Sequence, residues 1–313
     1  FFNIFFLSIF LHFFTELNLF INSLILIFGI ISFFIFFKKF IYQINGFKSY
    51  FLFLGILFLL SSITLRTYAD YEWYHLPYVN YLNNFKIIFG LVNLSNNYTY
   101  GHGWLDILGL FYLPIIETRG LTHLPVVFYF FFIVFFLIEY LKSNKLAIKF
   151  FSLSVIFFVL IIFNRIKDFG ADIQPTFTLL ILLFYILKSF TSHEVNYVNK
   201  ILYYFFYSCI LRIGSVIFLP LVFCYLLINY QNILSKKFFI SFKLYMFLSV
   251  FFIIFLTKNI FTTGCFFYPI PFTCIYDDKI IWSSPKENVE ERYEFLSSIS
   301  KRWKFYSIEE GNL

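Results

Sequence analysis

One short stretch, YADYEWYHLP at positions 68–77, gathers side chains that are suited to acid–base chemistry. It holds Asp70, Glu72 and His75 among aromatic residues. Such groups can act as a general base and its partner, and paired carboxylates can hold a divalent cation through their oxygens. The ordinary alternative is a solvated loop, because most carboxylates simply face water. The sequence leaves both interpretations open, and with them Mg²⁺ or Mn²⁺ as a cofactor.

A second set of side chains is suited to binding a phosphate group. Arg212 lies within a long apolar stretch, where a charge is costly and a partner such as a lipid phosphate is expected. Alternatively, the Arg212 side chain extends to the membrane interface, or it forms a salt bridge with Asp172 or another acid of the bundle. Asp172 itself could be a site residue or an acid favoured by a helix dipole, and Asp106 is equally ambiguous. The other basic candidates are Arg165, Lys167 and Arg119.

The composition indicates that these residues belong to a membrane protein. The chain has 313 residues, of which 60% are hydrophobic and only 13% are charged, and 53 are phenylalanines. A soluble domain has about a quarter of its residues charged, so lipid is the natural solvent for this chain. We therefore expect an all-α polytopic membrane protein.

The apolar segments give the expected number of helices. A membrane span needs about 20 apolar residues. Segment 201–230 predicts two short helices around Gly214, and 104–116 is short enough to be re-entrant or interfacial. The total is about 8–10 transmembrane or re-entrant helices. The clearest spans are 19–37, 50–64, 124–141, 146–163, 175–190 and 238–257.

Lysines predict which loops face the cytoplasm. One group of loops holds eleven lysines and a single acid, Glu194, whereas the opposite group holds five basic and six acidic residues. Basic residues stay inside, so the lysine-rich loops are expected to be cytoplasmic. The lysine-rich loops are 38–49, 142–149, 188–200 and 231–243. We expect a helical bundle over 1–257 with a long outer first loop at 65–103, and an outer tail over 258–313.

Other features of the chain narrow its class. It begins with Phe1 and its one methionine is Met246, which predicts a fragment of a longer protein. The net charge of +7 comes mainly from scattered lysines, so nucleic acid is not an expected partner.

Cys265 and Cys274 could form a disulfide outside the cytoplasm, or remain free thiols. Ser284 followed by Pro285 predicts the start of a helix in the tail.

Several pieces of the chain together resemble a known superfamily. The Asp70-x-x-x-Tyr74-His75-Leu76-Pro77 pattern resembles the acid-containing first outer loop of GT-C-type membrane glycosyltransferases. Further pieces follow in the order seen in an uncharacterised bacterial branch of that superfamily. They are "GLVNL" at 90–94, "GADIQPT" at 170–176, "LRIGSVIFLPLVF" at 211–223, "TGCFFYPIP" at 263–271, Trp282 and Pro285.

The resemblance implies a GT-C-like fold and an inverting glycosyltransferase of the bacterial inner membrane. The donor would be a polyprenyl-phosphate-linked sugar, and the acceptor a glycan, lipid or protein outside the cytoplasm. Asp70 would be the base, with Glu72 and His75 beside it and Arg212 on the phosphate. Better-known members have two adjacent acids in this loop, whereas Tyr71 separates Asp70 from Glu72 in this chain. A glycan polymerase and a transporter of a lipid-linked glycan are the alternatives.

Overall fold

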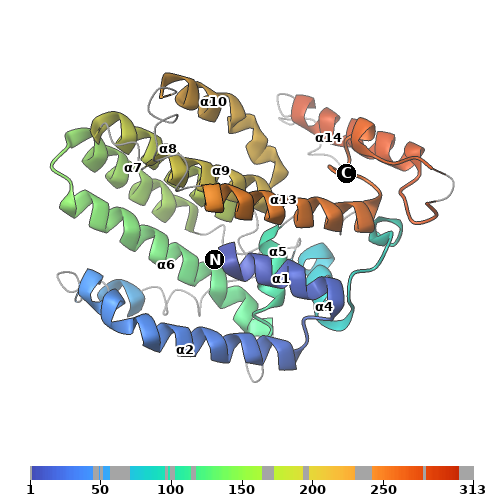
Figure 1. The fold of residues 1–313 in the computed structure, drawn as a ribbon, viewed down its shortest axis with the longest axis horizontal. Coiled ribbons are helices and arrows are strands. Elements are labelled where there is room, and N and C mark those ends of the chain that lie inside the picture. Colours follow the sequence, from blue (N-terminus) through green and yellow to red (C-terminus); the bar gives the residue numbers. More distant parts are fainter. Residues whose placement is uncertain are drawn as a thin grey trace, which may run out of the picture. The chain divides into compact units, whose positions relative to one another are not determined.

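The regular secondary structure of the described residues is helical in the computed structural model (Figure 1). These residues are 2–44, 49, 52–56, 71–95, 98, 103–113, 118–163, 173–192, 197–229, 242–277 and 280–302. The predicted all-α class is therefore confirmed for this part of the chain.

The helices follow the apolar segments, since a helix satisfies its own backbone polar groups where water is excluded. Their bounds in chain order are α1 (Phe2–Phe14), α2 (Leu19–Ile44), η2 (Tyr71–His75), α4 (Leu76–Asn84), η3 (Leu91–Asn93), α5 (Gly103–Gly109), α6 (Thr118–Lys142), α7 (Leu146–Ile162), α8 (Ile173–Ser192), α9 (Tyr197–Leu211), η6 (Ile213–Phe218), α10 (Leu219–Ile228), α13 (Phe242–Thr263), η7 (Pro271–Thr273) and α14 (Lys286–Arg302). Element η2 is a π-helical turn, and the other η elements are 3-10 helices.

The chain forms two compact units, each built from separate segments. The first comprises Phe1–Lys86 and His102–Phe252, and the second comprises Ile87–Gly101 and Ile253–Leu313. The predicted outer loop 65–103 thus contributes residues to both units.

Three described helices are long and apolar enough to cross a membrane, which marks the chain as a membrane protein. Their apolar windows are Leu19–Phe36, His123–Lys142 and Ile173–Thr191. Few residues of the first window are buried, as expected of a helix that faces lipid. Shorter apolar helices cover Leu146–Ile162, Gly214–Ile228 and Leu248–Thr263. The predicted span at 50–64 lies mostly outside the described residues, with a helix at 52–56.

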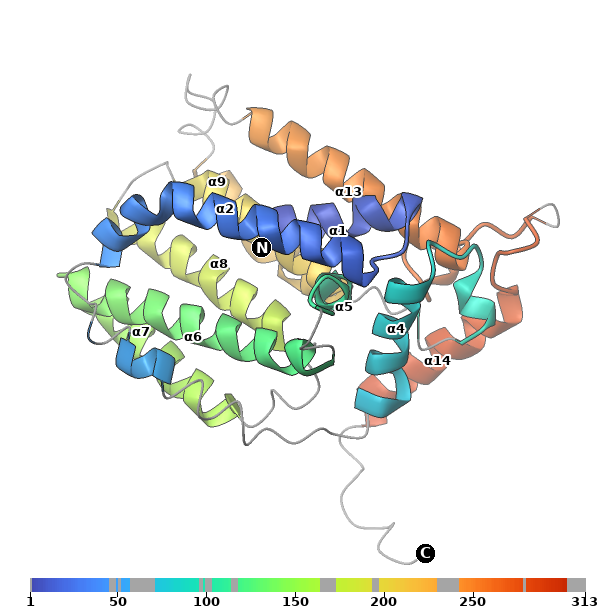
Figure 2. The ribbon, with the colours of Figure 1, turned by 90° about the horizontal axis from the view of Figure 1, so that it is seen from below.

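Aromatic rings pack the core between helices α6, α7, α8 and α9 of the first unit. The four helices lie side by side in Figures 1 and 2. The ring of Phe132 on α6 stacks on Phe177 of α8 with centroids 4.1 Å apart, and Tyr129 meets Phe177 edge-on at 4.5 Å. Offset and edge-on pairs of this kind add to the stabilisation from apolar burial. Near the other end of the same two helices, Lys188 Nζ lies 2.7 Å from Glu139 Oε2.

A short buried helix, α5, joins α1, α4 and α9 in the first unit. Its Trp104 side chain is fully buried against Phe128. The buried Nδ2 of Asn22 on α2 lies 2.9–3.0 Å from the carbonyl oxygens of Leu17, Gly109 and Tyr112, and its two hydrogens are shared among these three acceptors. This side chain holds the start of α2 against the end of α5.

Segment 201–230 forms two helices, as the sequence predicts, but the break begins at Arg212 rather than at Gly214. Helix α9 ends at Leu211, and Arg212 is extended with φ −152° and ψ 117°. A 3-10 helix over Ile213–Phe218 then leads into α10, whose first turn contains Pro220.

The second unit is held by close backbone approaches between its two segments. Gly90 donates its N–H to Phe261 O at 2.8 Å, and Asn93 Nδ2 donates to Trp282 O at 3.1 Å. Cys265 and Cys274 form a disulfide within it. The "GLVNL" and "TGCFFYPIP" pieces therefore meet in one small core, together with Trp282.

The predicted tail helix is present as α14, which begins at Lys286 directly after Pro285. The expected side-chain cap is not formed. Ser284 is buried and its Oγ has no hydrogen-bond partner among the described residues, while its backbone N–H donates to Thr263 O at 3.1 Å. Packing of Ser284 against the end of α13 replaces the cap.

Candidate functional site

A cavity of about 290 Å³ lies among α6, α8 and α9 of the first unit, and we call it the aromatic cavity. Most of its wall consists of phenylalanine and tyrosine rings, which suits an apolar ligand. It is lined by Phe128, Phe131, Phe132, Phe135, Gln174, Phe177, Thr178, Ile181, Tyr203, Tyr204, Tyr207 and Leu211.

The amide of Gln174 is the unusual polar group of this cavity. Gln174 lies in the first turn of α8, with 1% of its surface exposed. Its Nε2 has no hydrogen-bond partner among the described residues. A buried donor without an acceptor costs about 1–3 kcal/mol, so a ligand with an acceptor oxygen would relieve the cost. The neighbouring Thr178 hydroxyl is already engaged, because it donates to Pro175 O at 2.7 Å.

Arg212 lies at the same end of α9 as the aromatic cavity. It directly follows Leu211, which lines the cavity, and its own side chain is exposed. The backbone N–H of Arg212 donates to Ser208 O at 2.9 Å and closes the last turn of α9. The guanidinium therefore belongs to a break between helices rather than to the middle of an apolar helix.

The other predicted site residues are placed in different surroundings. Glu72 in η2 is exposed, whereas His75 at the end of η2 is 2% exposed and its ring packs against Tyr74 with centroids 4.2 Å apart. The structure does not bring these two side chains into one environment. Arg119 lies in the first turn of α6. Asp70, Asp172, Arg165 and Lys167 lie outside the described residues.

Asp106 on α5 has a buried carboxylate in the first unit. Tyr78 on α4 donates its hydroxyl to Asp106 Oδ1 at 2.9 Å, and both residues are buried. Burial, and then the nearby Asp106 charge, raise the pKa of Tyr78 well above its usual value, so the phenol keeps its proton. The sequence left Asp106 ambiguous, because only the fold shows its partner.

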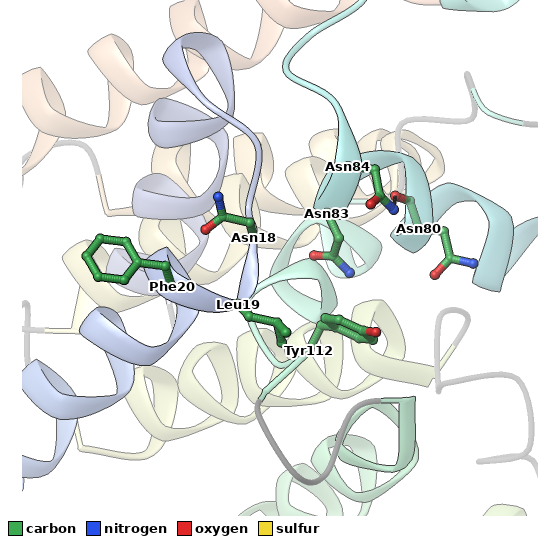
Figure 3. Close-up of a pocket in the computed structure, with 7 residues that line it drawn as sticks. All are labelled: Asn18, Leu19, Phe20, Asn80, Asn83, Asn84 and Tyr112. Atoms are coloured by element: carbon green, nitrogen blue, oxygen red, sulfur yellow. Dashed lines mark hydrogen bonds between the residues drawn. The ribbon is translucent and has the colours of Figure 1, made fainter.

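A second cavity, of about 350 Å³, lies where α4 approaches the start of α2 (Figure 3). We call it the asparagine pocket. Asn83 is 6% exposed, and neither polar atom of its side chain has a hydrogen-bond partner among the described residues. The sequence gives no signal for this site, because asparagines are common throughout the chain. Its lining residues are Asn18, Leu19, Phe20, Asn80, Asn83, Asn84 and Tyr112.

The described residues contain no group of three or more His, Cys, Asp or Glu side chains that could hold a metal ion. The acids that suggested Mg²⁺ or Mn²⁺ include Asp70, which is not described. The metal therefore stays a prediction from the sequence.

Comparison with known proteins identifies a family without a known activity. No curated protein matches the chain, and no solved structure does. A family described as a domain of unknown function, DUF8201, matches residues 1–311. Because that match spans nearly the whole sequence, the chain belongs to the DUF8201 family.

Proposed function

We propose that this protein is an inverting membrane glycosyltransferase, which moves a sugar from a polyprenyl-phosphate donor to an acceptor outside the cytoplasm. The observation that carries the proposal is the aromatic cavity, with the unsatisfied amide of Gln174 inside it and Arg212 directly after a lining residue. This combination suits a lipid with a long apolar tail and an anionic head.

The aromatic rings suit the tail of such a donor. An isoprenoid chain is branched and unsaturated, so it can lie against the faces of Phe132, Tyr203 and Tyr207. The tail would enter from lipid rather than from water, so its binding would depend on close packing against these rings and not on transfer out of water. The rest of the tail would stay in lipid, which lets a cavity of modest size hold a long donor.

The polar groups suit the head of the donor. Gln174 Nε2 can donate to a phosphate oxygen, and the Arg212 guanidinium can bind two phosphate oxygens at once. Positive charge at this position would also stabilise the phosphate as it leaves.

The transfer would run as a single displacement. An acceptor hydroxyl gives its proton to the Asp70 carboxylate as its oxygen attacks the anomeric carbon. The bond from that carbon to the phosphate oxygen breaks, and its electron pair leaves with the polyprenyl phosphate. Attack from the opposite side inverts the anomeric centre. A transporter of the same lipid would use the cavity and Arg212 but would not need Asp70.

Binding of a long-chain polyprenyl phosphate to the full chain in lipid nanodiscs tests the donor site. We expect Gln174→Leu and Arg212→Gln each to weaken binding by about tenfold, since each removes a phosphate contact. Lys145→Gln is the matched control, because Lys145 is an exposed cation in the loop after α6. Equal binding by all four proteins would overturn the proposal.

A further inference from the structure

The asparagine pocket has the features of a binding site for an uncharged, hydroxyl-rich ligand. We infer that it binds a neutral sugar residue. Resting on the proposed function, we assign that sugar to the acceptor glycan rather than to the donor. Three properties of the pocket carry the inference: an unsatisfied amide at its base, the absence of charge on its lining residues, and an apolar wall.

The unsatisfied amide belongs to Asn83. The side chains at the rim, Asn80 and Asn84, are exposed, whereas Asn83 is buried and extends from α4 toward Tyr112 (Figure 3). An asparagine amide has two donor hydrogens and an acceptor oxygen, so it can bind a hydroxyl that both donates and accepts. Leaving both polar atoms buried and unpaired weakens the fold, and binding of a sugar hydroxyl would remove that weakness.

The charge of the lining favours a neutral ligand. None of the lining residues is ionisable at neutral pH, and the Glu16 carboxylate accepts a hydrogen bond from the lining residue Asn18, from Nδ2 at 3.2 Å. A phosphate or carboxylate in the pocket would therefore find no cation among the lining residues. This separates the pocket from the aromatic cavity, where Arg212 suits an anionic head.

The apolar wall completes the match to a sugar ring. Leu19 and Tyr112 point toward the same side of the pocket, below Asn83 in the view of Figure 3. Pyranose rings present C–H groups on their faces and hydroxyls at their edges, so they pair with a wall of this kind beside amides. A volume of about 350 Å³ is within the range of small-ligand pockets.

The position of the pocket suits an acceptor. Its α4 residues follow the 68–77 stretch that carries Asp70, and its α2 residues begin the apolar window Leu19–Phe36. The pocket thus lies at the end of a span that the lysine distribution assigns to the outer side. An acceptor glycan there would be held by the same loop that carries the proposed base.

Ligand-detected NMR on the full chain in nanodiscs tests the inference. The probes are free glucose, galactose, mannose, rhamnose and N-acetylglucosamine, with glucuronate as an anionic sugar of similar size. We expect at least one neutral sugar to bind, and Asn83→Leu and Asn83→Ala to weaken its binding by at least about tenfold. Glucuronate should bind less well than the matching neutral sugar. Asn144→Leu, in the exposed loop after α6, should leave binding unchanged.

Thermal unfolding of the same variants separates a ligand site from a structural one. Without sugar, Asn83→Leu should raise the unfolding temperature, because it replaces an unsatisfied amide with an apolar side chain of similar size. The inference is overturned if no neutral sugar binds, or if binding survives in both Asn83 variants. Failure here, with polyprenyl phosphate still held through Gln174 and Arg212, would leave the proposed function intact. Sugar binding without polyprenyl-phosphate binding would support the sugar site and overturn the proposed function.

Discussion

The hydroxyl of Tyr78 donates a hydrogen bond to the Asp106 carboxylate at 2.9 Å and joins α4 to α5 inside the first unit. Both side chains are buried, so water cannot replace either partner of this hydrogen bond unless the fold opens. Helix α4 contributes Asn83 to the asparagine pocket, and α5 packs against α9. The pair therefore supports the elements that carry the proposed site.

Removing the hydroxyl should destabilise the first unit. Tyr78→Phe leaves the Asp106 carboxylate without this donor, at a cost of about 1–3 kcal/mol in the free energy of unfolding. Thermal unfolding in detergent measures the loss. Tyr276→Phe, at an exposed position in the second unit, should unfold like the wild type. If the two variants are equally stable, the hydrogen bond does not hold α4 in place.

Alkaline pH should destabilise the second unit through Tyr268. Burial raises the pKa of Tyr268 from 10.0 to about 12. The folded state therefore holds a proton that the unfolded state releases, so this contribution is complete below pH 10 and falls as pH rises toward 12. Unfolding measured across this window should show a shallower loss of stability in Tyr268→Phe than in the wild type. Tyr293→Phe, exposed on α14, should keep the wild-type slope.

Glycine should be required at position 264. Its φ of +77° disfavours a side chain, and an added Cβ would clash with the side chain of Ser283. Gly264→Ala should lower the free energy of unfolding of the second unit by about 1–2 kcal/mol or more. Gly29→Ala on α2 is the matched control, since an added Cβ there meets no atom within 4 Å. A wild-type unfolding temperature for Gly264→Ala would contradict this close packing.

The disulfide between Cys265 and Cys274 should protect two of the four cysteines from alkylation. In denaturant without reductant, the intact mass should show labels only on Cys209 and Cys224, which are the free thiols. Reduction should expose all four. Four labels before reduction would show that the bond is absent, and would remove one argument for an outer location of this segment.

The sequence predicted the helices better than it predicted the candidate site. Long apolar segments determine where helices form in lipid, so 124–141 and 175–190 were found within a few residues. The position of the break after α9 was missed by two residues. Glycine is only one way to end a helix, and here the extended conformation of Arg212 ends it.

The site residues depend on contacts that periodicity does not encode. Sequence reasoning named Asp172 in the "GADIQPT" piece, which lies outside the described residues, and it did not name Gln174, which lines the aromatic cavity. Asn83 gave no signal, because an amide becomes unusual only when burial leaves it without a partner. Ring pairs such as Phe132 and Phe177 likewise come from helices distant in the sequence.

Mass spectrometry of lipid-linked and surface glycans shows whether the protein transfers a sugar and whether Asp70 is needed for the transfer. The strains are wild type, deletion, Asp70→Asn and Gln174→Leu, with Lys145→Gln as the control and all variants at matched protein level. We expect the deletion and Asp70→Asn to lose the same single sugar, Gln174→Leu to reduce it, and Lys145→Gln to retain it. A profile that changes in the deletion but stays normal in Asp70→Asn would contradict the transferase and favour a transporter of the same lipid.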